Sequence, residues 1–173
     1  MDEIKQNKLI IKKLQSTDIE EVLFAMKELR NTGNKNLIPP VIELLANHKS
    51  ERVKKQAIEL LYDLKYQAAV PFIIEAIQSD DFRNIREQLL SVCWQSRLDF
   101  SEYIPVFIKY FIKGNFNEAF EAFTVIDSMD AKIEEKIATD SINKLKNEIN
   151  NIAENKKELL VELVHILENK ETK

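Results

Sequence analysis

The chain has 173 residues, of which 45% are hydrophobic and 31% are charged, and its formal net charge is −4. Such a composition is that of a soluble domain with enough apolar residues to bury a core. Two glycines are too few for a glycine-rich phosphate loop, and the acidic balance argues against a broad nucleic-acid surface. The single cysteine, Cys93, excludes an internal disulfide and favours a reducing compartment, so we expect a cytoplasmic protein.

The chain start and its apolar runs give no sign of export or membrane insertion. The opening "MDEIKQNKLIIKKL" has an acidic second residue and only three consecutive apolar residues, which does not fit a secretory signal. No stretch approaches the roughly 20 apolar residues that a membrane span needs. We therefore expect no membrane partner.

The first elements in chain order are two helices, predicted at residues 3–14 and 17–31. The apolar spacing in "LQSTDIEEVLFAMKELRNTGN" matches that of helices further along the chain, and Gly33 is placed to end the second helix. These helices make residues 1–33 an N-terminal unit.

Residues 34–129 contain one segment in three related copies. "LIPPVIELL", "AVPFIIEAI" and "YIPVFIKYF" carry Pro39, Pro71 and Pro105, which are spaced by 32 and 34 residues. Proline lacks an N–H and has a φ of about −65°, so it is tolerated in the first turn of a helix. Each proline therefore predicts the opening turn of a helix, or else a kink after a turn of preceding helix.

A second helix follows each proline-led helix after a polar joint. The three copies are "NHKSERVKKQAIELLYDL", "QSDDFRNIREQLLSVCWQS" and "KGNFNEAFEAFTVIDSMD", and Val53, Ile85 and Ala119 hold the equivalent core position in them. Short polar side chains are favoured as helix caps. The expected caps here are Ser50 and either Asp80 or Asp81.

The last segment, residues 130–173, reads as two longer helices whose register departs from the repeat. A period of 32–34 residues with two helices per copy and no strand-like alternation indicates an all-α superhelix. We predict an α-solenoid of about four helical pairs plus a C-terminal capping pair, in a single domain over residues 1–173.

Residues 9–129, roughly, resemble the HEAT repeat. Three features carry the resemblance: the proline-led helix, the polar joint, and the basic residue at the start of an Ala/Leu-rich second helix. The matching basic positions are Lys54 and Arg86, and the acidic joint position is Asp80 or Asp81. The resemblance implies that such residues form a ladder between repeats. Leu23 and Phe120 occupy the basic position in the flanking units, so a ladder could join only the central ones.

A HEAT-like solenoid implies a curved stack whose second helices line the concave side and serve as a binding platform. Some members of the wider fold class act on alkylated DNA bases and others attach bilin chromophores, so the fold alone does not fix the function.

The candidate partner-binding residues lie opposite the main apolar face of the second helices. Tyr62 and Trp94 fall in one column, 32 residues apart, and aromatic residues with a polar group are favoured at interfaces. The alternative is that this stripe packs against the neighbouring repeat. Residues expected beside the two rings are Tyr66, Leu98, Ile58 and Leu90, with Glu59, Glu87 and Glu121 favouring a basic partner.

The remaining chemistry-bearing residues give no catalytic, cofactor or metal motif. Cys93 lies on a packed helix face, and His48 and His165 are far apart in the chain. Phenylalanines at helical spacing are expected in the core. They are Phe72, Phe107, Phe111, Phe116, Phe120 and Phe123.

One local basic cluster supplies the contrasting hypothesis. It could contact phosphates, or it could form the ladder and be solvated for the rest. Its members are Arg52, Lys54, Lys55, Arg83 and Arg86. The sequence thus favours a non-catalytic protein- or peptide-binding scaffold or adaptor without a cofactor, with a nucleic-acid-binding protein or DNA-base-excising enzyme as the alternative.

Overall fold

The computed structural model describes residues 3–32 and 34–170, and within them the regular structure is helical, without strands. The chain divides into two compact units, Met1–Leu98 and Asp99–Lys173. The predicted all-α class is confirmed. The single-domain organisation stays a prediction.

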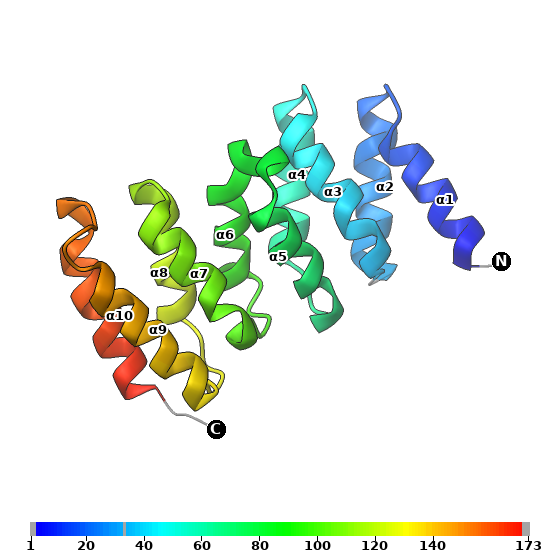
Figure 1. Ribbon diagram of the computed structural model, residues 1–173. Helices are drawn as coiled ribbons and strands as arrows, with labels where there is room; N and C mark the ends of the chain where they lie inside the picture. The colour runs from blue at the N-terminus through cyan, green and yellow to red at the C-terminus, as the bar shows by residue number, and fades with distance from the viewer. Residues whose placement is uncertain (1–2, 33, 171–173) are drawn as a thin grey trace. The chain divides into compact units, whose positions relative to one another are not determined.

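The first unit consists of three helical pairs (Figure 1). The predicted N-terminal pair is confirmed, while Gly33, expected to end its second helix, lies outside the described residues. The pairs are α1 (Glu3–Leu14) with α2 (Ile19–Thr32), α3 (Ile38–Asn47) with α4 (Glu51–Tyr62), and α5 (Val70–Gln78) with α6 (Arg86–Gln95).

Neighbouring pairs of this unit stack first helix on first helix and second helix on second helix. α3 packs against α1 and α5, while α4 packs against α2 and α6. The equivalent core residues Val22 and Val53 are fully buried, and Ile85 is nearly so. A short helical pair therefore becomes stable by covering the apolar face of the next one, as in an α-solenoid.

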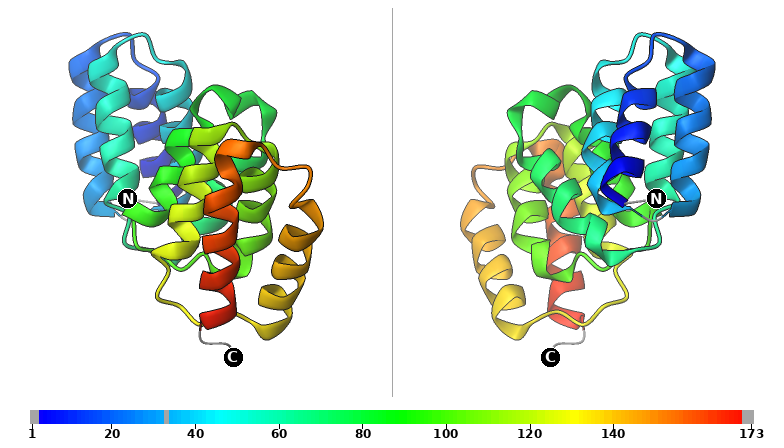
Figure 2. Two further views of the ribbon diagram at one scale, coloured as in Figure 1. Left: turned by 90° about the vertical axis from the view of Figure 1, so that its left-hand side faces the viewer. Right: turned by 90° about the vertical axis from the view of Figure 1, so that its right-hand side faces the viewer.

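The second unit contains two pairs, α7 (Ile104–Lys113) with α8 (Phe116–Asp127) and α9 (Glu135–Glu148) with α10 (Lys157–Asn169). α9 packs against α7 and α10 against α8 (Figure 2). The last pair thus covers α7 and α8, as expected of a capping pair. Phe107 and Phe111 of α7 are fully buried, and the Phe107 ring meets that of Phe100 edge to face at 6.1 Å.

The prolines begin helices rather than break them. α3, α5 and α7 each carry a proline within the first two helical positions. A short 3₁₀ turn precedes each helix, so the chain tightens before the proline starts regular α geometry. These turns are Lys35–Leu37, Gln67–Ala69 and Ser101–Tyr103.

The capping prediction was right in position for Ser50 and wrong for Asp80 and Asp81. Ser50 occupies the N-cap of α4 but makes no capping hydrogen bond with its side chain. In the next pair, Asp80 and Asp81 lie inside a 3₁₀ helix, Asp80–Ile85, which Ser79 caps by accepting a hydrogen bond from the Asp81 amide at 3.2 Å. The sequence pattern did not distinguish this 3₁₀ entry from a direct start of α6.

Candidate protein-binding surface

Tyr62 is the last residue of α4 and Trp94 lies in the last turn of the neighbouring helix α6, and both residues are half-buried. The Ser91 hydroxyl donates to the Gln88 carbonyl at 2.7 Å, so in the 3.1 Å contact between Tyr62 Oη and Ser91 Oγ the tyrosine is the donor. This hydrogen bond fixes Tyr62 across the joint between α4 and α6.

The stripe that includes these rings is divided between packing and exposure. Leu90 is fully buried, and Ile58 is half-buried. The apolar members of the stripe thus help to pack the repeats together, which agrees with the alternative that the stripe packs against the neighbouring repeat. Tyr62 and Trp94 nevertheless keep part of each ring accessible, and this accessible part is the candidate contact surface.

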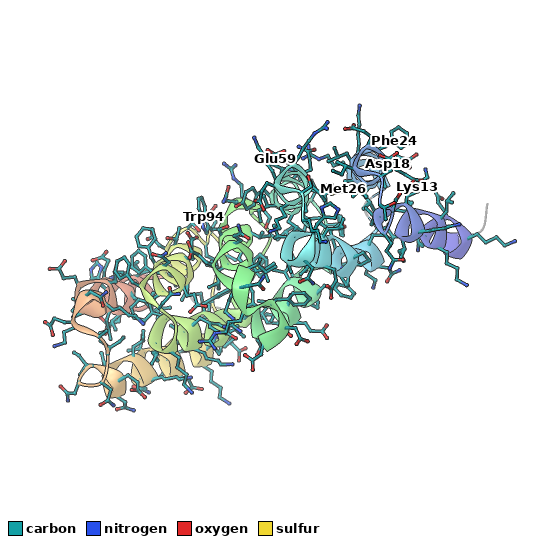
Figure 3. The ribbon with its side chains drawn as sticks, turned by 90° about the horizontal axis from the view of Figure 1, so that it is seen from above. Lys13, Asp18, Phe24, Met26, Glu59 and Trp94 are labelled. Carbon is teal, nitrogen blue, oxygen red and sulfur yellow. The ribbon has the colours of Figure 1, made fainter. Side chains whose placement is uncertain are left out.

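Two glutamates accompany the rings on the same helices. Glu59 is half-buried and accepts a hydrogen bond from Gln56 Nε2 at 2.7 Å, with Lys55 Nζ at 3.9 Å, while Glu87 is exposed on α6. Figure 3 shows Glu59 and Trp94 on the side of α4 and α6 that faces away from α3 and α5. Acidic and aromatic groups therefore occur together on the side of α4 and α6 that faces away from the first helices.

Tyr66 lies in the joint between α4 and α5 rather than on a helix face. It lines a hollow of about 410 Å³, at whose rim Arg30 and Asp63 form an ion pair at 2.9 Å. Burial raises the pKa of Tyr66 to about 12. The leucine and valine side chains beneath are almost inaccessible, so the rim is what a ligand would meet.

Leu98 is half-buried at the end of the first unit. Of the six predicted contact residues, five are half-buried and one is exposed, so each presents some surface to a partner. They are Tyr62, Tyr66, Trp94, Leu98, Glu59 and Glu87. Their role in binding stays a prediction.

The basic cluster is largely engaged in contacts within the first unit. Arg86 is buried, and its guanidinium donates from Nε to the Ile77 carbonyl at 2.8 Å and from a terminal nitrogen to the Ser79 carbonyl at 3.1 Å. These acceptors lie at the C-terminal end of α5, where carbonyls lack helical partners. Arg86 therefore stabilises its own helical pair and is withdrawn from any phosphate.

The other members of the cluster make ion pairs that differ from the expected ladder between repeats. Lys54 pairs with Glu51 of its own helix at 3.1 Å, and Lys55 approaches Glu59. Ion pairs between the first and second helical pairs join Arg52 of α4 to Glu20 of α2, and Arg30 of α2 to Asp63 at the end of α4. Arg86 lies 3.5 Å from the expected joint acid, Asp80, within its own helical pair, and Lys54 likewise pairs within its own helix. A ladder between repeats through Lys54 and Arg86 stays a prediction. Arg83 is exposed.

Two phenylalanines that were expected in the core are exposed on α8. Phe116 is 42% and Phe120 48% exposed, and their rings stack at 6.4 Å between centroids. Phe107 and Phe111 fulfil the core expectation, while Phe72 and Phe123 are half-buried. A signal for this surface was present in the sequence, since Phe120 occupies the basic position of the repeat, outside the core column.

The structure confirms that Cys93 is a buried residue of the helix core. Burial raises the pKa of the thiol, and Sγ donates to the Leu89 carbonyl at 3.5 Å. Within residues 3–32 and 34–170, no three or more His, Cys, Asp or Glu side chains are grouped so as to hold a metal ion. In the same part of the chain, no helix has the length and apolar character to cross a bilayer.

Comparison with known proteins agrees with the helical pairing. No curated protein matches the chain. The family model for HEAT repeats matches residues 7–92, a segment that runs from α1 into α6. Through this segment, the chain belongs to the HEAT-repeat family.

Proposed function

We propose that this HEAT-repeat protein is a non-catalytic scaffold or adaptor, which binds another protein or a peptide through the side of α4 and α6 that faces away from α3 and α5, the side expected to be concave in a HEAT-like stack. HEAT repeats are commonly protein-interaction scaffolds. The observation that supports the proposal most is the pair of half-buried rings, Tyr62 and Trp94, at equivalent positions of neighbouring helices. We place the protein in the cytoplasm because its one cysteine is a buried thiol.

The rings suit this role for an energetic reason. Each offers a large rigid area with only two side-chain torsions to order, so little conformational entropy is lost when a partner covers it. Tyr62 is already ordered by its bond to Ser91. Contacts with such preorganised aromatic residues commonly dominate binding energies.

The test is affinity capture from the native cell with the full chain as bait, compared with Trp94→Ala and Tyr62→Ala. We expect loss of the specifically bound proteins with both variants. The matched control is Phe24→Ala, which removes a ring that is 57% exposed on α2. If the bound proteins were the same for wild type and for both variants, the assignment to α4 and α6 would be wrong.

A further inference from the structure

The second unit carries an exposed aromatic surface that neither the fold nor the family assigns. On α8, Ala119, Ala122 and Ile126 are fully buried, whereas Phe116 and Phe120 stand 42% and 48% exposed as a stacked pair. Aromatic carbon left in water forfeits the favourable free energy that its burial would give. Exposed aromatic clusters of this kind are typical of contact sites.

The neighbouring helix extends this surface. The core positions of α8 and α10 correspond with an offset of 41 residues, from Ala119 with Leu160 to Ile126 with Leu167. The same offset puts Phe120 level with Val161, which is 63% exposed. Because α10 packs directly against α8, the two helices together present three exposed apolar side chains.

Acidic residues predominate around these side chains. α8 and α10 contain one lysine, Lys157, which pairs with Glu154. Glu158 and Glu162 are exposed and have no ion-pair partner among residues 3–32 and 34–170. The acidic residues of the two helices are Glu118, Glu121, Asp127, Glu158, Glu162 and Glu168.

This combination selects one kind of occupant. Lysine and arginine side chains bind both to the faces of aromatic rings and to carboxylates, and they cover rings with their apolar stems. An acidic segment, a nucleic acid or an anionic membrane surface would be repelled by unpaired carboxylates. A neutral apolar partner would leave Glu158 and Glu162 without compensation near its edge.

We propose that the outer side of α8 and α10 binds a lysine- or arginine-rich peptide segment of another protein. Basic side chains of that segment lie over Phe116 and Phe120 and reach Glu158 and Glu162, and an apolar residue covers Val161. This surface belongs wholly to the second unit and does not depend on Tyr62 or Trp94.

The experiment measures the affinity of the full chain for two fluorescent peptides by anisotropy. One peptide is an amphipathic sequence of leucine, alanine and lysine, and the other has every lysine replaced by glutamate. We expect binding of the lysine peptide alone, weakening as salt rises because charges at the rim are screened. The double substitution Phe116→Ala with Phe120→Ala should weaken binding by about tenfold or more.

A second pair of variants separates the contributions and the two proposals. Glu158→Gln with Glu162→Gln should weaken binding by a few-fold and flatten its salt dependence. Trp94→Ala should leave the peptide affinity unchanged. The proposal for α8 and α10 can therefore be refuted while the proposal for α4 and α6 stands, and the proposal for α4 and α6 can be refuted while this one stands. Circular dichroism of each variant checks that the helices persist.

Three results would overturn the proposal. The first is an equal affinity for the lysine and glutamate peptides, and the second is an affinity unaffected by loss of both phenylalanines. The third is self-association of the wild-type chain in sedimentation that the phenylalanine variant abolishes, because a second copy would then cover the rings.

Discussion

Lys156, a buried lysine, caps the C-terminal end of a helix in the second unit, as Arg86 does in the first unit. Lys156 is 4% exposed, and its Nζ donates to the carbonyls of Phe111, Ile112 and Gly114 at 3.0, 3.2 and 2.6 Å. These carbonyls end α7, as Ile77 and Ser79 end the equivalent helix α5. Phe120 holds the position in α8 that Arg86 holds in α6, but its side chain has no hydrogen-bond donor. Lys156, from the following helical pair, donates to the carbonyls at the end of α7 instead.

This arrangement predicts a large loss of stability from one substitution. Lys156→Met keeps the length and apolar stem of the side chain but leaves three carbonyls without their donor. We expect the free energy of unfolding to fall by about 2–4 kcal/mol, the range for breaking a buried charged hydrogen-bond group. Urea denaturation followed by circular dichroism measures it. Lys157→Met, at an exposed neighbouring position, should change stability by less than about 1 kcal/mol; equal effects would refute the capping role.

A second residue-scale prediction concerns Tyr66, whose pKa burial raises from 10.0 to about 12. Between these values the unfolded chain has lost the phenolic proton and the folded protein retains it. Stability from this group is therefore present below pH 10 and is lost as the pH rises toward 12. Unfolding free energies measured across this window should fall more steeply for wild type than for Tyr66→Phe. Parallel curves would show that the phenol is not desolvated in the folded state.

At the scale of elements, the sequence predicted the helical pairs because apolar spacing and prolines report local requirements. Pro39, Pro71 and Pro105 begin helices because the missing N–H costs nothing in a first turn. The 3₁₀ entry to α6 was not predictable, since Ser79, Asp80 and Asp81 are all good caps and tertiary packing chooses among them. Likewise, nothing local indicates that Lys156 will reach across 42 to 45 residues to cap α7.

The turn between α7 and α8 gives an element-scale prediction with an unusual sign. Replacing glycine by alanine often stabilises a protein by restricting the unfolded chain. At Gly114, however, an added Cβ would lie 2.5 Å from the Tyr110 carbonyl oxygen and 2.8 Å from Glu118 Cβ, although its φ of −70° is ordinary. A larger residue is therefore excluded from position 114 by steric contact with Tyr110 and Glu118, and not by the backbone conformation.

We expect Gly114→Ala to lower the free energy of unfolding by about 1–3 kcal/mol, because the helix end or the α8 capping box must shift. Thermal and urea unfolding both measure the change. Asn147→Ala, at an exposed position of α9, serves as control and should be neutral or slightly stabilising through helix propensity. A stabilised Gly114→Ala protein would contradict the contact distances.

At the scale of the whole molecule, the candidate sites were less predictable than the fold. The column of Tyr62 and Trp94 follows from the repeat period alone, but periodicity cannot tell a ring that packs between repeats from one that a partner can reach. Phe116 and Phe120 were expected in the core because phenylalanine is usually buried. Their exposure depends on which side of α8 is covered by α7 and α10, a property of the packed unit.

The charge distribution of the whole chain favours peptide binding over nucleic-acid binding. Phosphate binding requires cations free to displace counterions, yet Arg86 is buried and Arg52, Lys54 and Lys55 lie within reach of glutamates. With 25 basic against 29 acidic residues, the chain as a whole also repels a polyanion.

We therefore predict no measurable affinity for labelled duplex DNA at physiological salt in anisotropy titrations. At low salt any residual binding should be unaffected by Lys55→Glu with Arg83→Glu, beyond the change produced by Lys136→Glu with Lys144→Glu, two exposed lysines of α9. The two double variants alter net charge equally, so a local phosphate site is the one cause that separates them. Tight binding by wild type, lost with the first pair and kept with the second, would establish the nucleic-acid function instead.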